Sequence, residues 1–217
     1  MAGAVGLTPA HLLLREATRD AHEAAEATAG MRLLLAGELD ASGYAGLLRA
    51  QLALFRAWEA ERSGWLAGLE EWRYVSRASL IEADLCRSRF IGDSARNNAT
   101  YTAAAPIADE SAPTEHGAGQ VAARRAEQGA AAWGELYVIE GSALGGRVIV
   151  RRLRELYPAL PHHFYAVGEN APASWRRFQS LLDHVLPDEA SQEAAVNAAR
   201  QMFARFQQTL KDPAAHD

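Results

Sequence analysis

Residues 133–153 read WGELYVIEGSALGGRVIVRRL, with apolar residues at helical spacing and no strand-like alternation. Three glycines fall within six positions of this stretch: Gly141, Gly145 and Gly146. Each costs about 0.5–1 kcal/mol relative to alanine inside a helix. Such a glycine-broken helix needs close approach of its backbone, either by another helix or by a ligand. A phosphate loop is not indicated, because the glycines follow no strand and lack the G-x-G-x-x-G spacing.

Helical periodicity extends over most of the chain, so we expect an all-α bundle of six or seven helices in a single domain, 1–217. Capping residues, glycines and prolines predict where the helices begin and end. We expect helices at 8–29 (ended by Gly30), from 40 or 42 through 58, at 75–90, from 122 to before Pro158, from 170 or 174, and from 188 to about 210. Residues 92–119 are rich in Gly, Asn, Thr, Ser and Pro, and we expect an irregular segment there.

The net charge of -5 argues against a nucleic-acid partner, which would favour a basic surface. The most apolar stretch, residues 136–150, contains Glu140 and Arg147 and is too short to span a bilayer, so we expect no membrane partner. The N-terminus lacks the features of a signal peptide. Cys86 is the only cysteine and has apolar neighbours, so we expect it to be buried, in a cytoplasmic protein.

A second informative stretch is LREATRDAHEAAE, residues 14–26. On a helix, Arg15, Arg19 and Glu26 lie on the same side as His22. A metal-binding imidazole needs an acceptor for its other N–H, and Glu26 is suitably placed. Two arginines suit a ligand that carries carboxylates. The alternative is the solvated face of an amphipathic helix; the combination with the glycine-containing helix favours a ligand site.

Together, residues 14–26 and 133–153 resemble the biliverdin-producing heme oxygenases, especially the bacterial branch that includes suppliers of phytochrome chromophores. A weaker match runs through Ser76–Leu85, and the order of segments fits this family from about Leu12 to Phe206. The resemblance implies an all-α bundle that encloses heme between two helices.

The resemblance also implies roles for individual residues. His22 matches the proximal iron ligand, and Glu26 matches the acidic residue that supports it. Gly141, Gly145 and Gly146 match the kinked distal helix, whose backbone lies over the heme. The basic positions that meet the heme propionates are matched by Arg15, Arg19 and Arg176. Animal-type members carry an aspartate after the first distal glycine, where this chain has Ser142, so the group that orders the distal water is left open.

By the same resemblance, heme is both cofactor and substrate, and is opened with O2 to biliverdin while iron and carbon monoxide are released. Electrons would come from an external electron donor, a reductase or a ferredoxin-like protein, because no flavin or nicotinamide motif is visible. A phytochrome would be a further partner in that bacterial branch.

Three rival interpretations stay open. A non-enzymatic heme or bilin-binding protein on the same fold would share these motifs. A related helical enzyme that cleaves thiamin-like substrates would need a reactive cysteine, and Cys86 has no histidine nearby in the sequence. A di-iron bundle would need Glu-x-x-His pairs, which are lacking before His22 and His184. We expect the remaining histidines, including His11, His162 and His163, to lie at the surface.

Overall fold

The computed structural model describes residues 7–88 and 115–211, and the side chains of residues 87–88, 115–122 and 170–172 are not described. Among the described residues the ordered elements are helices and no strand occurs, which confirms the all-α prediction. The helices are α1 (Ala10–Ala17), α2 (Arg19–Glu26), α3 (Ala29–Ala36), α4 (Ala41–Glu61), α5 (Ser63–Ala67), α6 (Arg77–Ser88), α7 (Glu115–Leu156), α8 (His163–Ala166), the 3-10 helix η2 (Val167–Asn170), α9 (Ala171–Val185) and α10 (Glu189–Leu210).

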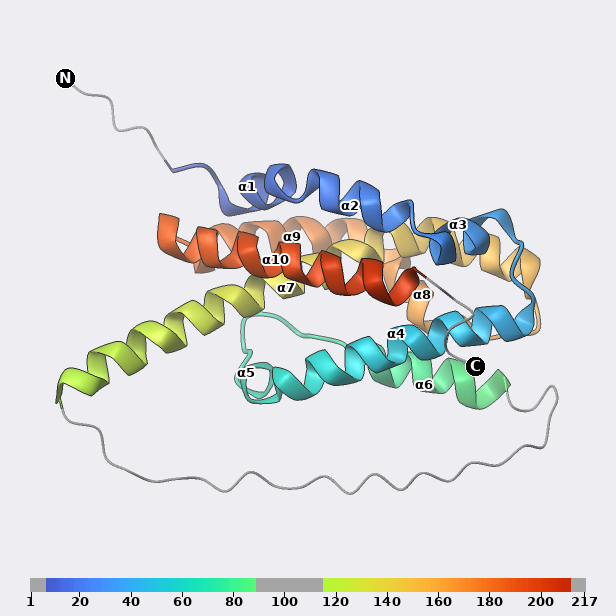
Figure 1. The fold of residues 1–217 in the computed structure, drawn as a ribbon, viewed down its shortest axis with the longest axis horizontal. Helices are drawn as coiled ribbons and strands as arrows, with labels where there is room; N and C mark the ends of the chain where they lie inside the picture. Colours follow the sequence, from blue (N-terminus) through green and yellow to red (C-terminus); the bar gives the residue numbers. More distant parts are fainter. Residues whose placement is uncertain (1–6, 89–114, 212–217) are drawn as a thin grey trace.

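The chain folds into three layers around α7 (Figure 1). Helices α1 to α3 lie along one side, α9 and α10 lie with α7 in the middle, and α4 to α6 lie along the other side. The core between the layers contains fully buried aromatic side chains from α4 and α9, such as Phe55, Trp58 and Phe178. Gly134 lets α10 approach α7, because a Cβ at this position would lie 2.0 Å from the backbone oxygen of Ala195.

The caps of α4 and α10 form as predicted. The Asp40 carboxylate accepts a hydrogen bond of 2.7 Å from the backbone N–H of Gly43. Asp188 accepts one of 2.8 Å from Ser191 in a capping box. These side chains satisfy N–H groups that lack partners within their helices.

The predicted first helix is wrong in two respects. It divides at Thr18, where φ is -114° and ψ is 7°, into α1 and α2. Gly30 does not end it but lies inside α3, where the backbone oxygen of Leu210 would be 2.7 Å from a Cβ. The residue that ends α3 is Gly37, in the left-handed conformation with φ 74°, which favours glycine.

The predicted irregular segment is too long at its C-terminal end, because residues 115–119 belong to α7. Gly117 and Gly119 suggested a loop, but the alanine-rich residues that follow favour a helix and offset their cost. Residues 92–114 of that segment lie outside the described residues. Helix α7 also continues through the three glycines at 141–146, so hydrogen bonding along the helix is not broken there.

Three surface and burial predictions are also wrong, those for Cys86, His11 and His162. Cys86 is exposed. His11 is half-buried, and its Nδ1 lies 2.7 Å from the Asp183 carboxylate. His162 is buried beside Tyr44. His163 is exposed, as predicted, although its backbone N–H and ring bond the Asp84 carboxylate at 2.8 and 2.7 Å. Each of the three histidines meets a residue distant in the sequence, which local pattern does not reveal. Within the described ranges, no helix is long and apolar enough to cross a membrane.

Candidate functional site

A cavity of about 630 Å³ lies between the α1–α2 pair and the glycine-containing part of α7. Side chains of α8, α9 and α10, such as Phe164, Trp175 and Phe203, complete its walls. The predicted site residues that line it are Arg15, Arg19, His22, Glu26, Gly141, Ser142, Gly145 and Gly146. Two segments that lie far apart in the sequence therefore share one cavity.

The corner at Thr18 sets the direction of α2. Thr18 is 2% exposed, and its hydroxyl donates a hydrogen bond of 2.7 Å to the Leu14 backbone oxygen. Two side chains of α10 hold the segment in place, because Arg200 donates to the oxygen of Ala17 and Gln207 donates to that of Ala21, each at 3.0 Å. His22, one turn after the corner, is thereby directed to the cavity.

The His22 ring stands edge-on to Phe203, with 5.8 Å between ring centroids and 82° between ring planes. Its Nε2 lies 3.7 Å from Oε1 of Glu26, which is an ion-pair distance and too long for a hydrogen bond. The His22 side chain is 57% exposed, so the imidazole is accessible to a ligand. Among the described residues that line the cavity, His22 is the only imidazole.

The predicted propionate-binding arginines do not all reach the cavity. Arg15 and Arg19 line it, and the Arg19 guanidinium also pairs with Glu16 on the preceding turn. Arg176 of α9 is exposed and is absent from the lining, to which α9 contributes Trp175 and Gln179 instead.

The three glycines of α7 have different surroundings. A Cβ at Gly145 would meet nothing within 4 Å, so this glycine borders open space in the cavity. A Cβ at Gly141 would be in ordinary contact with the Trp175 ring at 3.4 Å. At Gly146 it would lie 2.8 Å from the backbone oxygen of Tyr165. The two explanations offered by the sequence, a ligand and helix packing, thus apply to different glycines.

Gly168, which the sequence did not suggest, contributes to the same packing. A Cβ at Gly168 would lie 1.8 Å from the Ala143 backbone oxygen, so η2 contacts α7 through backbone atoms. The Ser142 hydroxyl donates a hydrogen bond of 2.7 Å to the backbone oxygen of Ile139. The hydroxyl hydrogen of Ser142 is therefore already donated to an acceptor within α7.

Sequence reasoning missed several polar residues of the cavity, including Gln51, Arg77 and Tyr137. Burial raises the pKa of Tyr137, with the Thr18 hydroxyl and the Arg15 charge acting in the opposite direction, so the phenol stays protonated at neutral pH. Arg77 falls within the weakly matching segment 76–85, and its position there was the only available indication.

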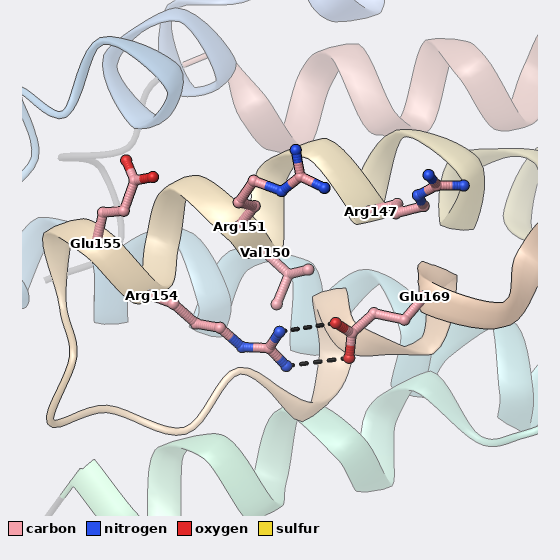
Figure 2. Close-up of a pocket in the computed structure, with 6 residues that line it drawn as sticks. All are labelled: Arg147, Val150, Arg151, Arg154, Glu155 and Glu169. Carbon is pink, nitrogen blue, oxygen red and sulfur yellow. Dashed lines mark hydrogen bonds and ion pairs between the residues drawn. The ribbon is translucent and has the colours of Figure 1, made fainter.

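A second, smaller cavity of about 330 Å³ lies between the C-terminal part of α7 and η2 (Figure 2). Arg154 and Glu169 form a double ion pair across it, at 2.7 and 3.0 Å, and Arg147 and Arg151 extend away from this pair. Charged residues dominate its lining. It is a poorer candidate than the larger cavity for an apolar ligand.

The donor set of the larger cavity limits what it can hold. Over the described parts of the chain, no group of three or more His, Cys, Asp or Glu residues gathers around one point. The His22 imidazole, the neighbouring arginines Arg15 and Arg19 and an apolar wall do suit a metal that brings its own planar ring of donors and peripheral carboxylates. The residues present therefore fit heme. The apolar lining residues include Met31, Ile149, Phe164, Phe203 and Phe206.

Comparison with known proteins agrees with this chemistry. The sequence model of the family described as "Heme oxygenase" matches residues 9–212. A protein named "Heme oxygenase" from Xanthomonas campestris pv. campestris (strain 8004) is 36% identical over 184 residues, which cover 83% of this chain and 96% of that protein. The chain belongs to the heme oxygenase family.

Proposed function

We propose that this chain is a heme oxygenase that binds heme through His22 and opens it to biliverdin, with release of iron and carbon monoxide. The observation that carries the proposal is the cavity that faces His22 on one side and the bare backbone at Gly145 on the other. Membership of the heme oxygenase family supports the same activity.

In this proposal each side chain has a limited task. His22 would bind the heme iron through its imidazole, and Glu26 would orient that ring. Arg15 and Arg19 bind the propionates, and Arg176 remains a predicted third partner. Bound heme would supply both the iron that activates O2 and the ring that is oxidised. Gly145 would leave room for a ligand on the side of the cavity opposite His22. Gly141 and Gly146, which lie against Trp175 and Tyr165, stay predicted members of the same site.

The proposal includes an electron donor and a phytochrome as partners, and both rest on the sequence alone. Electrons would come from a reductase or ferredoxin-like donor, because the sequence has no flavin or nicotinamide motif. Membership of the phytochrome-associated bacterial branch, a phytochrome as recipient of the product, and a cytoplasmic location also stay predictions.

The test uses purified protein, hemin, O2 and a chemical reductant. We expect the wild type to bind one hemin and to produce a compound with the biliverdin absorption spectrum. His22→Ala should change the absorption spectrum of bound hemin and abolish turnover, and added imidazole should restore part of the spectrum. His184→Ala, which changes a histidine of α9 outside the cavity lining, is the control. An unchanged hemin spectrum in His22→Ala would contradict the assignment.

Ser142 favours one alternative, a non-enzymatic heme or bilin-binding protein on the same fold. Its hydroxyl donates to Ile139 and brings no negative charge to the cavity. The same assay separates the two functions, because a carrier would bind hemin through His22 and leave it intact after reductant and O2 are added.

A further inference from the structure

Four of the five tryptophans of the chain lie in one cluster of neighbouring aromatic rings. The cluster begins at Trp175, which lines the larger cavity together with Tyr137, and the centroids of these two rings lie 5.5 Å apart. Phe178 of α9 is stacked on Trp175, with 5.7 Å between ring centroids and 29° between ring planes. Phe178 is fully buried and is not part of the cavity lining, so the cluster leaves the cavity at this ring.

Two branches lead away from Phe178. The first reaches Trp133 of α7, with 6.1 Å between ring centroids, and then Trp65 of α5, with 5.2 Å between ring centroids. Trp133 is buried and Trp65 is half-buried, so this branch connects the cavity wall with the protein surface. The second branch ends at Trp72, whose ring centroid lies 4.8 Å from that of Phe178.

The chemistry of indole distinguishes this cluster from ordinary core packing. Aromatic rings at these distances stabilise a core, and phenylalanine would serve that purpose as well. Indole and phenol are, among side chains without sulfur, the groups that lose one electron most readily. A row of neighbouring indoles therefore lets an electron move through the protein in short steps.

The surroundings of the two end residues favour the branch that ends at Trp65. The guanidinium carbon of Arg177 lies 5.6 Å from the centre of the Trp72 ring, and a cation over an indole opposes the loss of an electron from it. The Trp72 indole N–H is buried and has no hydrogen-bond partner among the described residues, so no acceptor is in place for its proton. Trp65 is half-buried, and solvent can accept a proton there.

We propose that Trp175, Trp133 and Trp65 form a path along which an electron passes from the protein surface to oxidised hemin in the larger cavity. Phe178 is not itself oxidised and keeps the neighbouring rings in contact. The path gives the protein a second, protective activity, which is the reduction of hydroperoxides that reach the bound hemin. This inference rests on the proposed function only in requiring that hemin occupy this cavity.

The electrons and protons of this activity balance. A hydroperoxide ROOH accepts two electrons and two protons; its O–O bond breaks, and ROH and water form. Hemin gives up both electrons, and Trp175 returns one of them. Trp65 replaces the electron that Trp175 has lost, releases its indole proton to solvent, and recovers an electron and a proton from a one-electron reductant in solution, such as ascorbate. Two such passages restore hemin, so each hydroperoxide consumes two molecules of ascorbate.

The test mixes the ferric hemin complex with peracetic acid, a small acyl hydroperoxide, without a reductant, and records the electron paramagnetic resonance spectrum of the frozen mixture. We expect an organic radical in the wild type, with a narrower signal when the protein contains ring-deuterated tryptophan, which assigns the radical to indole. Mass spectrometry after repeated additions should find Trp65 oxidised.

Three variants that keep an aromatic ring in place locate the path. Trp175→Phe and Trp133→Phe each interrupt it and should abolish the oxidation of Trp65. Trp72→Phe, which changes the other neighbour of Phe178, is the matched control and should leave the oxidation of Trp65 as in the wild type. If the rings only stabilised the core, Trp65 would be oxidised equally in all variants or in none, and either result would overturn the inference.

Trp65→Phe keeps the inference testable if a buried variant fails to fold. In the wild type, ascorbate should quench the radical rapidly, because the path ends at the surface. In Trp65→Phe the radical should persist in the presence of ascorbate, because the remaining indoles of the path are farther from solvent. Equally fast quenching in both proteins would overturn the inference.

Failure of the inference and of the proposed function give different results. Trp65→Phe should turn hemin over as the wild type does, because Trp65 lies outside the cavity lining. If hemin binds through His22 and is turned over, while Trp65 is never oxidised, only the electron path is wrong. If the wild type does not bind hemin, both proposals are wrong.

Discussion

Neighbouring glycines of α7 serve different purposes, which substitutions can separate. Gly145→Ala should fold and gain about 0.5–1 kcal/mol of unfolding free energy, because its Cβ meets nothing and alanine favours a helix. Gly146→Ala should lose about 1–3 kcal/mol, because its Cβ would press on the Tyr165 backbone oxygen. Urea unfolding without hemin measures both. Equal effects of the two variants would contradict this division.

The buried imidazole of His162 makes the free energy of unfolding depend on pH. Its Nε2 lies 3.1 Å from the Tyr157 backbone oxygen and its Nδ1 lies 3.1 Å from the Tyr44 hydroxyl, which suits a neutral imidazole. Burial lowers its pKa in the folded state below the ordinary value of 6.5. The unfolded chain therefore takes up the proton first as pH falls. His162 thus favours folding above about pH 6.5, and this contribution is lost as pH falls toward the lower folded pKa.

We expect His162→Asn to be less stable than wild type at pH 7.5, and the difference between them to shrink at pH 5.5. Urea unfolding of the variant and of wild type at the two pH values measures this. A difference that grows at pH 5.5 would show that the sign is wrong.

At the scale of elements, the contact between α7 and α10 depends on Gly134. A Cβ there would lie 2.0 Å from the backbone oxygen of Ala195, and a helix backbone cannot move aside as a flexible side chain can. Gly134→Ala should therefore cost about 3 kcal/mol or more, the upper range for overpacking. The matched control is Gly129→Ala on the same helix, where a Cβ meets nothing within 4 Å and should add about 0.5–1 kcal/mol. Thermal unfolding without hemin should place the two variants on opposite sides of wild type.

The same scale explains what the sequence could predict. Helices α4 and α10 begin where predicted, because Asp40 and Asp188 cap them through atoms only a few residues away. The position of Gly30 inside α3 could not be foreseen, because it depends on the Leu210 backbone.

The residues of the candidate site also fall into two groups: those that local sequence could predict and those that depend on distant residues. The spacing of Arg15, Arg19 and His22 on one helical face is local, and the family resemblance linked this face to the glycines of α7. Arg77 was missed as a residue of the cavity wall, because its ion-pair partner, Glu140, lies on a helix far along the chain. Burial of His162 likewise depends on a residue distant in the sequence, Tyr44.

For the whole molecule, the weakest wall of the cavity is α2, none of whose residues is buried. Its opposite wall is α7, which packs extensively on the core. A ligand that contacts both walls should stabilise α2 most, since none of the residues of this helix is buried without the ligand. We therefore expect hemin to slow hydrogen exchange in α2 far more than in α4, which serves as the internal control.

Hemin in excess should also raise the unfolding temperature. Binding at a free concentration 100 times Kd adds about 2.7 kcal/mol, which corresponds to roughly 5–10 °C for a chain of this size. Replacing both Arg15 and Arg19 with glutamate should weaken hemin binding and reduce this increase, because both arginines line the cavity that would hold the propionates. Equal slowing of exchange in α2 and α4, or an unchanged increase in the arginine variant, would mean that hemin binds somewhere other than between α2 and the glycines of α7.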